Sequence, residues 1–153
     1  MESINLITIK KEVWVEASQE TAFHVFTEQI DLWWPRTHHV GSCPMRHVVI
    51  EAKPGGRWYT LHEDGSEVNI GYVMVYLPYD QIALAWQINA DFKCDPELLT
   101  EVTVQFIPDG PTSTKVILMH KDLDKLGSGN KTAESMEMGW GMIMNLYKKQ
   151  AEQ

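Results

Sequence analysis

The sequence predicts an α+β fold in which a curved antiparallel β-sheet faces one long C-terminal α-helix. Through the middle half of the chain, apolar side chains fall mostly at alternate positions, in short runs separated by turn residues, as in successive antiparallel strands. Within Thr132–Lys149, large apolar residues recur at steps of four and three, which predicts one helical stripe formed by Met136, Trp140, Ile143 and Tyr147. Strands in succession with segregated helices favour α+β over a parallel sheet.

The N-terminal part of the chain predicts one strand followed by short helical structure. Leu6–Glu16 alternates apolar and charged residues and is expected to form a strand at an accessible edge. Ser18 stands where a helix N-cap belongs. Phe23 and Phe26 then supply the apolar face of a short helix, which Asp31–Pro35 ends.

Six further strands and a final helix complete the prediction. The strands are expected at Val48–Glu51, Arg57–His62, Ile70–Leu77, Ile82–Ile88, Thr100–Ile107 and Thr114–Lys121. Asp64-Gly65 reads as a hairpin turn and Pro108–Pro111 as the most pronounced turn of the chain. Gly127–Asn130 is expected to end the sheet and cap the final helix. With no repeat and no linker, residues 1–153 are expected to form a single domain.

Composition restricts the classes of partner and the compartment. The formal net charge of −8 argues against nucleic acid and against an anionic membrane surface as partners. No apolar run reaches the roughly 20 residues of a membrane-spanning helix, and the N-terminus lacks the layout of a signal peptide. Cys43 and Cys94 are too few and too far apart to indicate a disulfide framework. We therefore expect a cytoplasmic protein.

Several motifs occur in an order that resembles a known family. They are Trp33-Trp34-Pro35 followed by His38, then Pro54-Gly55-Gly56-Arg57-Trp58, Asp64-Gly65, Trp86-Gln87-Ile88, Thr100–Phe106 and Gly139-Trp140. In this order they resemble the START-like, or SRPBCC, superfamily, and within it the branch named for activators of heat-shock-protein ATPase. The resemblance covers roughly the whole chain. The chain departs from the family at Gln19, where a proline often opens the first helix.

The resemblance implies a helix-grip fold, with two short helices after the first strand and a hydrophobic pocket between the sheet and the C-terminal helix. Members bind lipids, hormones, polyketides or co-chaperone clients, and some are cyclases, so the fold alone selects no reaction. We expect binding of a small hydrophobic or aromatic ligand, lipid-like or polyketide-like, without cofactor or metal. The expected lining is Trp33, Trp34, His38, Trp58, Trp86, Met136, Trp140 and Ile143.

The composition of the chain, and of its last helix in particular, supports a ligand site. Six tryptophans are many for 153 residues, although each can equally be core. Methionine adapts to irregular apolar shapes, and the helix carries Met136, Met138, Met142 and Met144. Each glycine inside a helix costs about 1 kcal/mol relative to alanine. Gly139 and Gly141 therefore indicate either open space beneath the helix or a close backbone approach, and we favour open space.

Other functions stay open at this stage. A polyketide cyclase-type enzyme would use His62 or His120 for acid–base chemistry, because each shares the inward parity of its strand. A third possibility is co-regulation of a chaperone ATPase, as the branch name suggests. Arg57 is either an exposed strand charge or a partner for an acidic headgroup.

The loop after Pro35 also invites a metal interpretation, which we do not favour. His38, His39, Cys43 and His47 fall within ten residues, but their spacing matches no established zinc pattern. A hydrogen-bonding His38 at the rim of the pocket is the preferred interpretation.

Overall fold

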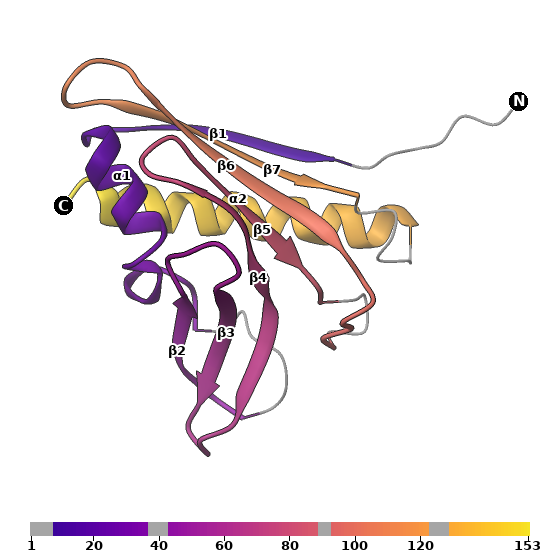
Figure 1. The fold of residues 1–153 in the computed structure, drawn as a ribbon. Helices are drawn as coiled ribbons and strands as arrows, with labels where there is room; N and C mark the ends of the chain where they lie inside the picture. The colour runs from indigo at the N-terminus through magenta and orange to yellow at the C-terminus, as the bar shows by residue number, and fades with distance from the viewer. Residues whose placement is uncertain (1–7, 37–42, 89–92, 123–128) are drawn as a thin grey trace, which may run out of the picture.

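The protein folds into one seven-stranded antiparallel sheet that curves around a long helix, as a computed structural model shows (Figure 1). The structure describes residues 8–36, 43–88, 93–122 and 129–153, and in the last segment it describes side chains from residue 136 onward. The strands are β1 Ile9–Val15, β2 Met45–Ile50, β3 Arg57–His62, β4 Glu67–Leu77, β5 Gln81–Trp86, β6 Thr100–Pro108 and β7 Thr114–Lys121. The helices are α1 Gln19–Phe26, the 3-10 turn η1 Ile30–Leu32, and α2 Gly129–Ala151.

The strand order is β1-β7-β6-β5-β4-β3-β2, so the first and second strands of the chain form the two edges of the sheet. In Figure 1, α2 runs along one side of the sheet, while β2 and β3 turn away from the direction of β1 and β7. Most inward positions of the strands are apolar, as with Val116 and Leu118 of β7, and a few carry buried histidine or threonine. The core therefore lies between this concave face and the buried stripe of α2.

The predicted elements are confirmed, with shifts at their ends. β3 and β7 have the predicted bounds, and the predicted turns at Asp64-Gly65 and Pro108–Pro111 connect adjacent strands. β2 begins at Met45, three residues earlier than expected, where it pairs with His62. β5 ends at Trp86, and Ile88 pairs only in an isolated bridge with Cys94. The helix α2 extends beyond its predicted range at both ends.

The helical stripe of α2 is also confirmed. Trp140, Ile143 and Tyr147 are buried, and Met136 is partly buried against the core. The methionines of α2 divide, because Met144 is buried whereas Met138 is 78% exposed. Among the described residues, no helix has the length and apolarity needed to cross a membrane.

The first helix is fixed by its cap and by Gln19. Ser18 accepts a hydrogen bond from the Thr21 backbone N–H at 3.2 Å, which confirms it as the N-cap of α1. The Gln19 side-chain amide donates to the Phe106 carbonyl at 2.9 Å and to Asp80 at 3.1 Å. The residue that replaces the family's proline therefore joins α1 to β6 and to the turn between β4 and β5.

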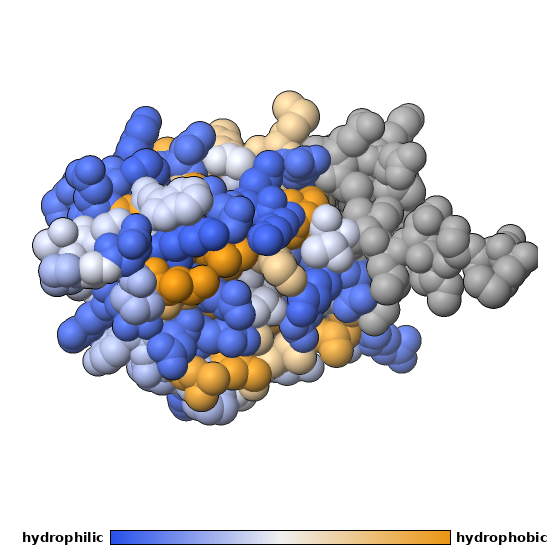
Figure 2. Space-filling model, turned by 90° about the horizontal axis from the view of Figure 1, so that it is seen from above, coloured by the Kyte–Doolittle hydropathy of each residue, from blue (hydrophilic) through white to orange (hydrophobic). Residues whose placement is uncertain are grey.

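The outer face of the sheet carries both polar and apolar side chains. Seen from above, the molecule shows a mostly polar surface that is interrupted by apolar patches (Figure 2). Glu101, Thr103 and Gln105 lie on the outer face of β6, as their shared parity predicts, and they line a shallow groove of about 150 Å³. Thr103 Oγ1 and Lys121 Nζ both donate to Glu101, at 2.8 and 3.4 Å, so these three polar groups of the groove bind one another.

We predict that Gly139→Ala stabilises the protein. A Cβ built at Gly139 meets no described atom within 4 Å, so alanine should raise the free energy of unfolding by about 0.5–1 kcal/mol through its higher helix propensity. Gly71→Ala is the control, because its Cβ would lie 1.7 Å from the Ala85 carbonyl oxygen and should cost roughly 1–3 kcal/mol. Urea unfolding measures both changes, and a destabilising Gly139→Ala would contradict the open space seen here.

Candidate functional site

Four tryptophans form a closed ring of contacts between α2 and the sheet. Neighbouring ring centroids are separated by 6.0 Å for Trp34–Trp58, 5.5 Å for Trp58–Trp86, 5.9 Å for Trp86–Trp140 and 6.0 Å for Trp140–Trp34. The interplanar angles lie between 60° and 86°, which are the edge-to-face and tilted arrangements that aromatic rings prefer. We call these four residues the tryptophan ring.

The sheet brings two of these indoles together across a glycine. Trp58 of β3 pairs with Gly71 of β4, and Gly71 pairs in turn with Trp86 of β5. Side chains on two strands that flank a third strand are normally almost 10 Å apart, which is two strand spacings. Because Gly71 has no side chain between them, the two indoles meet at 5.5 Å. A side chain at this position would also clash with the Ala85 carbonyl, which lies close to Gly71.

A chain of hydrogen bonds connects α2 to three strands through His120. Trp140 Nε1–H donates to His120 Nδ1 at 3.1 Å, so the imidazole proton lies on Nε2 and is donated to Thr100 Oγ1 at 2.8 Å. The Thr100 hydroxyl donates in turn to the Trp86 carbonyl at 3.0 Å. Burial lowers the pKa of His120 to about 3, so the imidazole is neutral at physiological pH.

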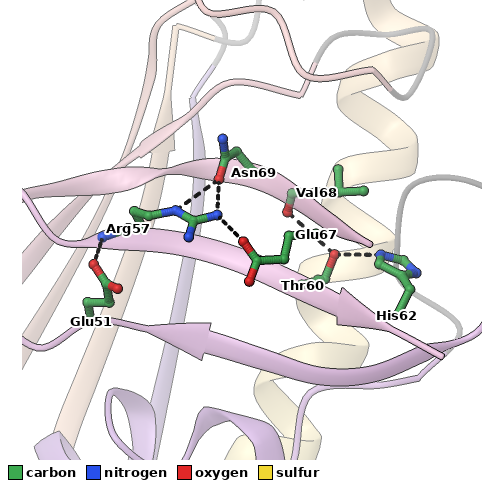
Figure 3. Close-up of polar contacts among 7 residues, drawn as sticks. All are labelled: Glu51, Arg57, Thr60, His62, Glu67, Val68 and Asn69. Atoms are coloured by element: carbon green, nitrogen blue, oxygen red, sulfur yellow. Dashed lines mark hydrogen bonds and ion pairs between the residues drawn. The ribbon is translucent and has the colours of Figure 1, made fainter. Parts of the chain in front are cut away.

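His62 is also held by two hydrogen bonds. It lies on β3, near the opposite edge of the sheet from His120. It is buried on the inward face of β3 together with Trp58 and Thr60. Its Nδ1 donates to the Cys43 carbonyl at 2.8 Å, and its Nε2 lies 2.8 Å from Thr60 Oγ1 (Figure 3). The predicted inward parity of both histidines is confirmed. In both, however, the two ring nitrogens already have protein partners.

Trp58 differs from its neighbours in its polar atom. The Trp58 side chain is buried, with 1% of the residue exposed. Its Nε1–H has no hydrogen-bond acceptor among the described residues. Trp33, Trp86 and Trp140 donate to Val25 O, Ile88 O and His120 Nδ1 respectively. A buried donor without a partner costs about 1–3 kcal/mol, so Trp58 carries a cost that its neighbours avoid.

A second aromatic group fills the other end of the core. Phe26 contacts Trp33, Phe106 and Tyr147 at 5.2–6.0 Å. The Tyr147 hydroxyl donates to the Ala22 carbonyl at 2.7 Å, and burial raises the pKa of this phenol. Trp33 lies 5.9 Å from Trp34 and joins this group to the tryptophan ring.

Asp31 anchors the segment that carries Trp33 and Trp34. Its carboxylate accepts from the Val48 N–H at 3.0 Å, from His47 Nδ1 at 2.7 Å and from Arg36 at 2.8 Å. Burial acts to raise the pKa of Asp31, but these hydrogen bonds outweigh it and lower the pKa. The η1 segment is thereby fixed against the edge strand β2.

Arg57 belongs to the outer surface of the sheet. Its guanidinium donates to Asn69 Oδ1 at 2.9 Å and to Glu67 Oε1 at 3.0 Å (Figure 3), and it lies 4.0 Å from the centre of the Tyr59 ring. These contacts favour the interpretation of Arg57 as a strand charge over that of a headgroup partner.

The candidate metal ligands divide between described and undescribed parts of the chain. Of these, His38 and His39 lie outside the described residues, His47 pairs with Asp31, and the Cys43 carbonyl accepts from His62. Within the described ranges, no three His, Cys, Asp or Glu side chains come together as a metal site would require.

The structure brings together half of the predicted lining residues. Trp34, Trp58, Trp86 and Trp140 form the tryptophan ring, whereas Trp33 packs mainly toward the second aromatic group. Ile143 is buried and Met136 partly buried in the same core. The predicted His38 lies outside the described residues.

Sequence reasoning did not include His120 and Thr100 in the lining. Trp86 and Trp140 contact the His120 ring at 5.3 and 6.0 Å, and Thr100 bonds to it. The alternation of β7 did place His120 on the inward face, as a candidate for acid–base chemistry, and the same alternation in β6 could have identified Thr100 as its partner, since a buried imidazole needs partners.

Comparison with known proteins gives a family and several structural relatives. The family model described as "Activator of Hsp90 ATPase homolog 1-like protein" matches residues 16–150. CalC, a self-sacrificing resistance protein from Micromonospora echinospora, is 28% identical, with 94% of this chain and 93% of that chain covered and a TM-score of 0.70. The anthrahydroquino-Gama-pyrone synthase Txn09 is also 28% identical, with 91% and 96% covered and a TM-score of 0.64.

A more distant structure shares the fold alone. An HSP90 activator from Plasmodium falciparum is 18% identical, with 88% of this chain and 87% of that chain covered and a TM-score of 0.59. A search of curated protein sequences finds no match.

We predict that His120 makes the protein less stable as the pH falls below about 6.5. The unfolded imidazole has a pKa near 6.5 and the folded one about 3, so between these values the unfolded state binds more protons. One proton lowers the free energy of unfolding by up to about 1.4 kcal/mol for each pH unit below 6.5. Above pH 6.5 it adds no pH dependence. Urea unfolding from pH 5 to 7 measures this. The difference in free energy of unfolding between wild type and His120→Gln should change with pH by this slope. Parallel curves would show that the folded imidazole is not held neutral.

Proposed function

Since this chain belongs to the family of Activator of Hsp90 ATPase homolog 1-like proteins and has their helix-grip fold, we propose that it binds a small aromatic or apolar molecule between α2 and the sheet. The observation that carries this proposal is the tryptophan ring, in which indoles from α2, β3, β5 and the segment after η1 face one another. Ligand sites of this kind are mostly apolar with few polar groups.

One of the two relatives at 28% identity supports an aromatic ligand. The name of the synthase Txn09 describes a fused-ring aromatic compound, and the chain covers 96% of that protein. Flat fused rings are complementary to indole faces, which gain from stacked and edge-to-face contact. We therefore favour a polyketide-like aromatic over a lipid as the guest of the tryptophan ring.

A guest requires that at least one indole turns. Adjacent ring centroids already lie at contact distance, 5.5–6.0 Å apart. Trp86 is partly exposed, whereas Trp34, Trp58 and Trp140 are at most 4% exposed. Trp86 therefore has the most room to move and lies where the ring meets solvent.

A polyketide cyclase-type enzyme remains the second candidate, and the geometry supports it less. Acid–base catalysis by His62 or His120 requires a nitrogen that can exchange a proton with the substrate. Both nitrogens of each imidazole are within 2.8–3.1 Å of a protein partner. A pKa of about 3 also makes His120 a weak base at neutral pH. Co-regulation of a chaperone ATPase rests on the family description, and stimulation of the ATPase by this protein would support it.

We predict that aromatic ligands shift helix and sheet signals together. In ¹H–¹⁵N spectra, emodin and naringenin should move the indole signals of Trp140 in α2 and of Trp58 and Trp86 in the sheet, and lauric acid should move them less. The indole of Trp14 is the internal control, because it is 51% exposed on the outer face. If no compound moves the helix and sheet indoles together, the proposed function is wrong.

We predict that Trp86→Leu weakens binding of the best of these ligands about tenfold, equivalent to about 1.4 kcal/mol. The loss comes from the aromatic contact area that leucine cannot supply. Trp14→Leu is the matched control and should leave the affinity unchanged. Isothermal titration calorimetry measures both, and equal affinities for the two variants would place the ligand elsewhere.

A further inference from the structure

The tryptophan ring offers one hydrogen bond that the protein itself does not use. Trp58 Nε1–H is buried without an acceptor among the described residues, and its ring is flanked by Trp34 and Trp86. A neighbouring ring face is only a weak acceptor compared with an oxygen. A buried donor without a partner in a native protein calls for an explanation, and a site built to bind an acceptor group is one.

Resting on the proposed function, we infer that Trp58 Nε1–H is the specificity-determining donor of the site, and that the ligand is an aromatic molecule with a carbonyl oxygen that accepts this hydrogen bond. Indoles are donors only. Both nitrogens of His120 are used, one by Trp140 and one by Thr100. The tryptophan ring and its imidazole therefore present a free donor and no free ring nitrogen to accept, so a ligand gains from carrying an acceptor.

The same observation separates this ligand class from a cation. Four indoles around a common centre suit a cation by their ring faces. A buried N–H carries positive partial charge, however, and it repels a cation while attracting an oxygen lone pair. The donor therefore favours a neutral carbonyl compound over an ammonium compound.

On this inference, a ligand reaches Trp58 past Trp86. Trp86 is the partly exposed member of the tryptophan ring and contacts Trp58 at 5.5 Å. Its own N–H is occupied by the Ile88 carbonyl at 3.0 Å, so it guides the ligand by its ring face alone. A carbonyl that passes Trp86 then meets the unused N–H of Trp58.

Two probes of nearly the same shape test the inference, 1-tetralone with a carbonyl and tetralin without one. We expect wild type to bind 1-tetralone about tenfold more tightly than tetralin, which is the size of one neutral hydrogen bond. Trp58→Phe should abolish this preference while changing tetralin affinity little, and Trp14→Phe should keep it. In ¹H–¹⁵N spectra of wild type, the Trp58 indole proton should move downfield with 1-tetralone and not with tetralin.

The outcomes separate this inference from the proposed function. If both probes bind wild type equally, or if Trp58→Phe weakens both equally, the inference fails and the proposed function stands. If neither probe binds at the tryptophan ring, both fail. Should Trp58→Phe not fold, the indole proton of wild type decides, and the same shift with both probes would overturn the inference.

Discussion

The hydrogen bond from the Trp140 indole to His120 is the constraint around which the interior is built. It is buried and joins α2 to β7, and through Thr100 it continues to β6 and to the Trp86 carbonyl of β5. A buried polar group must find a partner, so each member of this chain fixes the orientation of the next. The position of the helix over the sheet and the placement of two indoles therefore depend on one neutral imidazole.

The two ends of the core differ because of this arrangement. At the α1 end, aromatic rings pack on one another and the polar atoms of Trp33 and Tyr147 donate to backbone carbonyls. At the other end, Trp86 is partly exposed and the Trp58 N–H has no acceptor among the residues that the structure describes. At the α1 end these polar atoms all have protein partners, whereas among the described residues the tryptophan ring has one buried donor without an acceptor and one partly exposed indole. This difference is the reason for proposing the ligand site at the tryptophan ring and not at the α1 end.

The sequence predicts the elements well because their signals are local. Alternation gives the inward faces of β3 and β7, turn residues give the hairpins, and the Trp140, Ile143 and Tyr147 spacing gives the buried stripe of α2. The site is less predictable because it depends on register between strands. That Trp58 meets Trp86 across Gly71 follows from pairing over three strands, which no local pattern encodes. Trp33 illustrates the limit, since its neighbour Trp34 enters the ring while it packs toward Phe26.

The state of His120 connects the fold with the choice between binding and catalysis. A useful general base has a pKa near the working pH. Burial moves the pKa of His120 far below that range, and its Nδ1 lone pair is already held by Trp140. To take a proton there, the imidazole would have to give up the bond that positions α2. An imidazole that supports the helix in this way is suited to a structural role, and in the proposed site recognition of the ligand would fall to the Trp58 N–H.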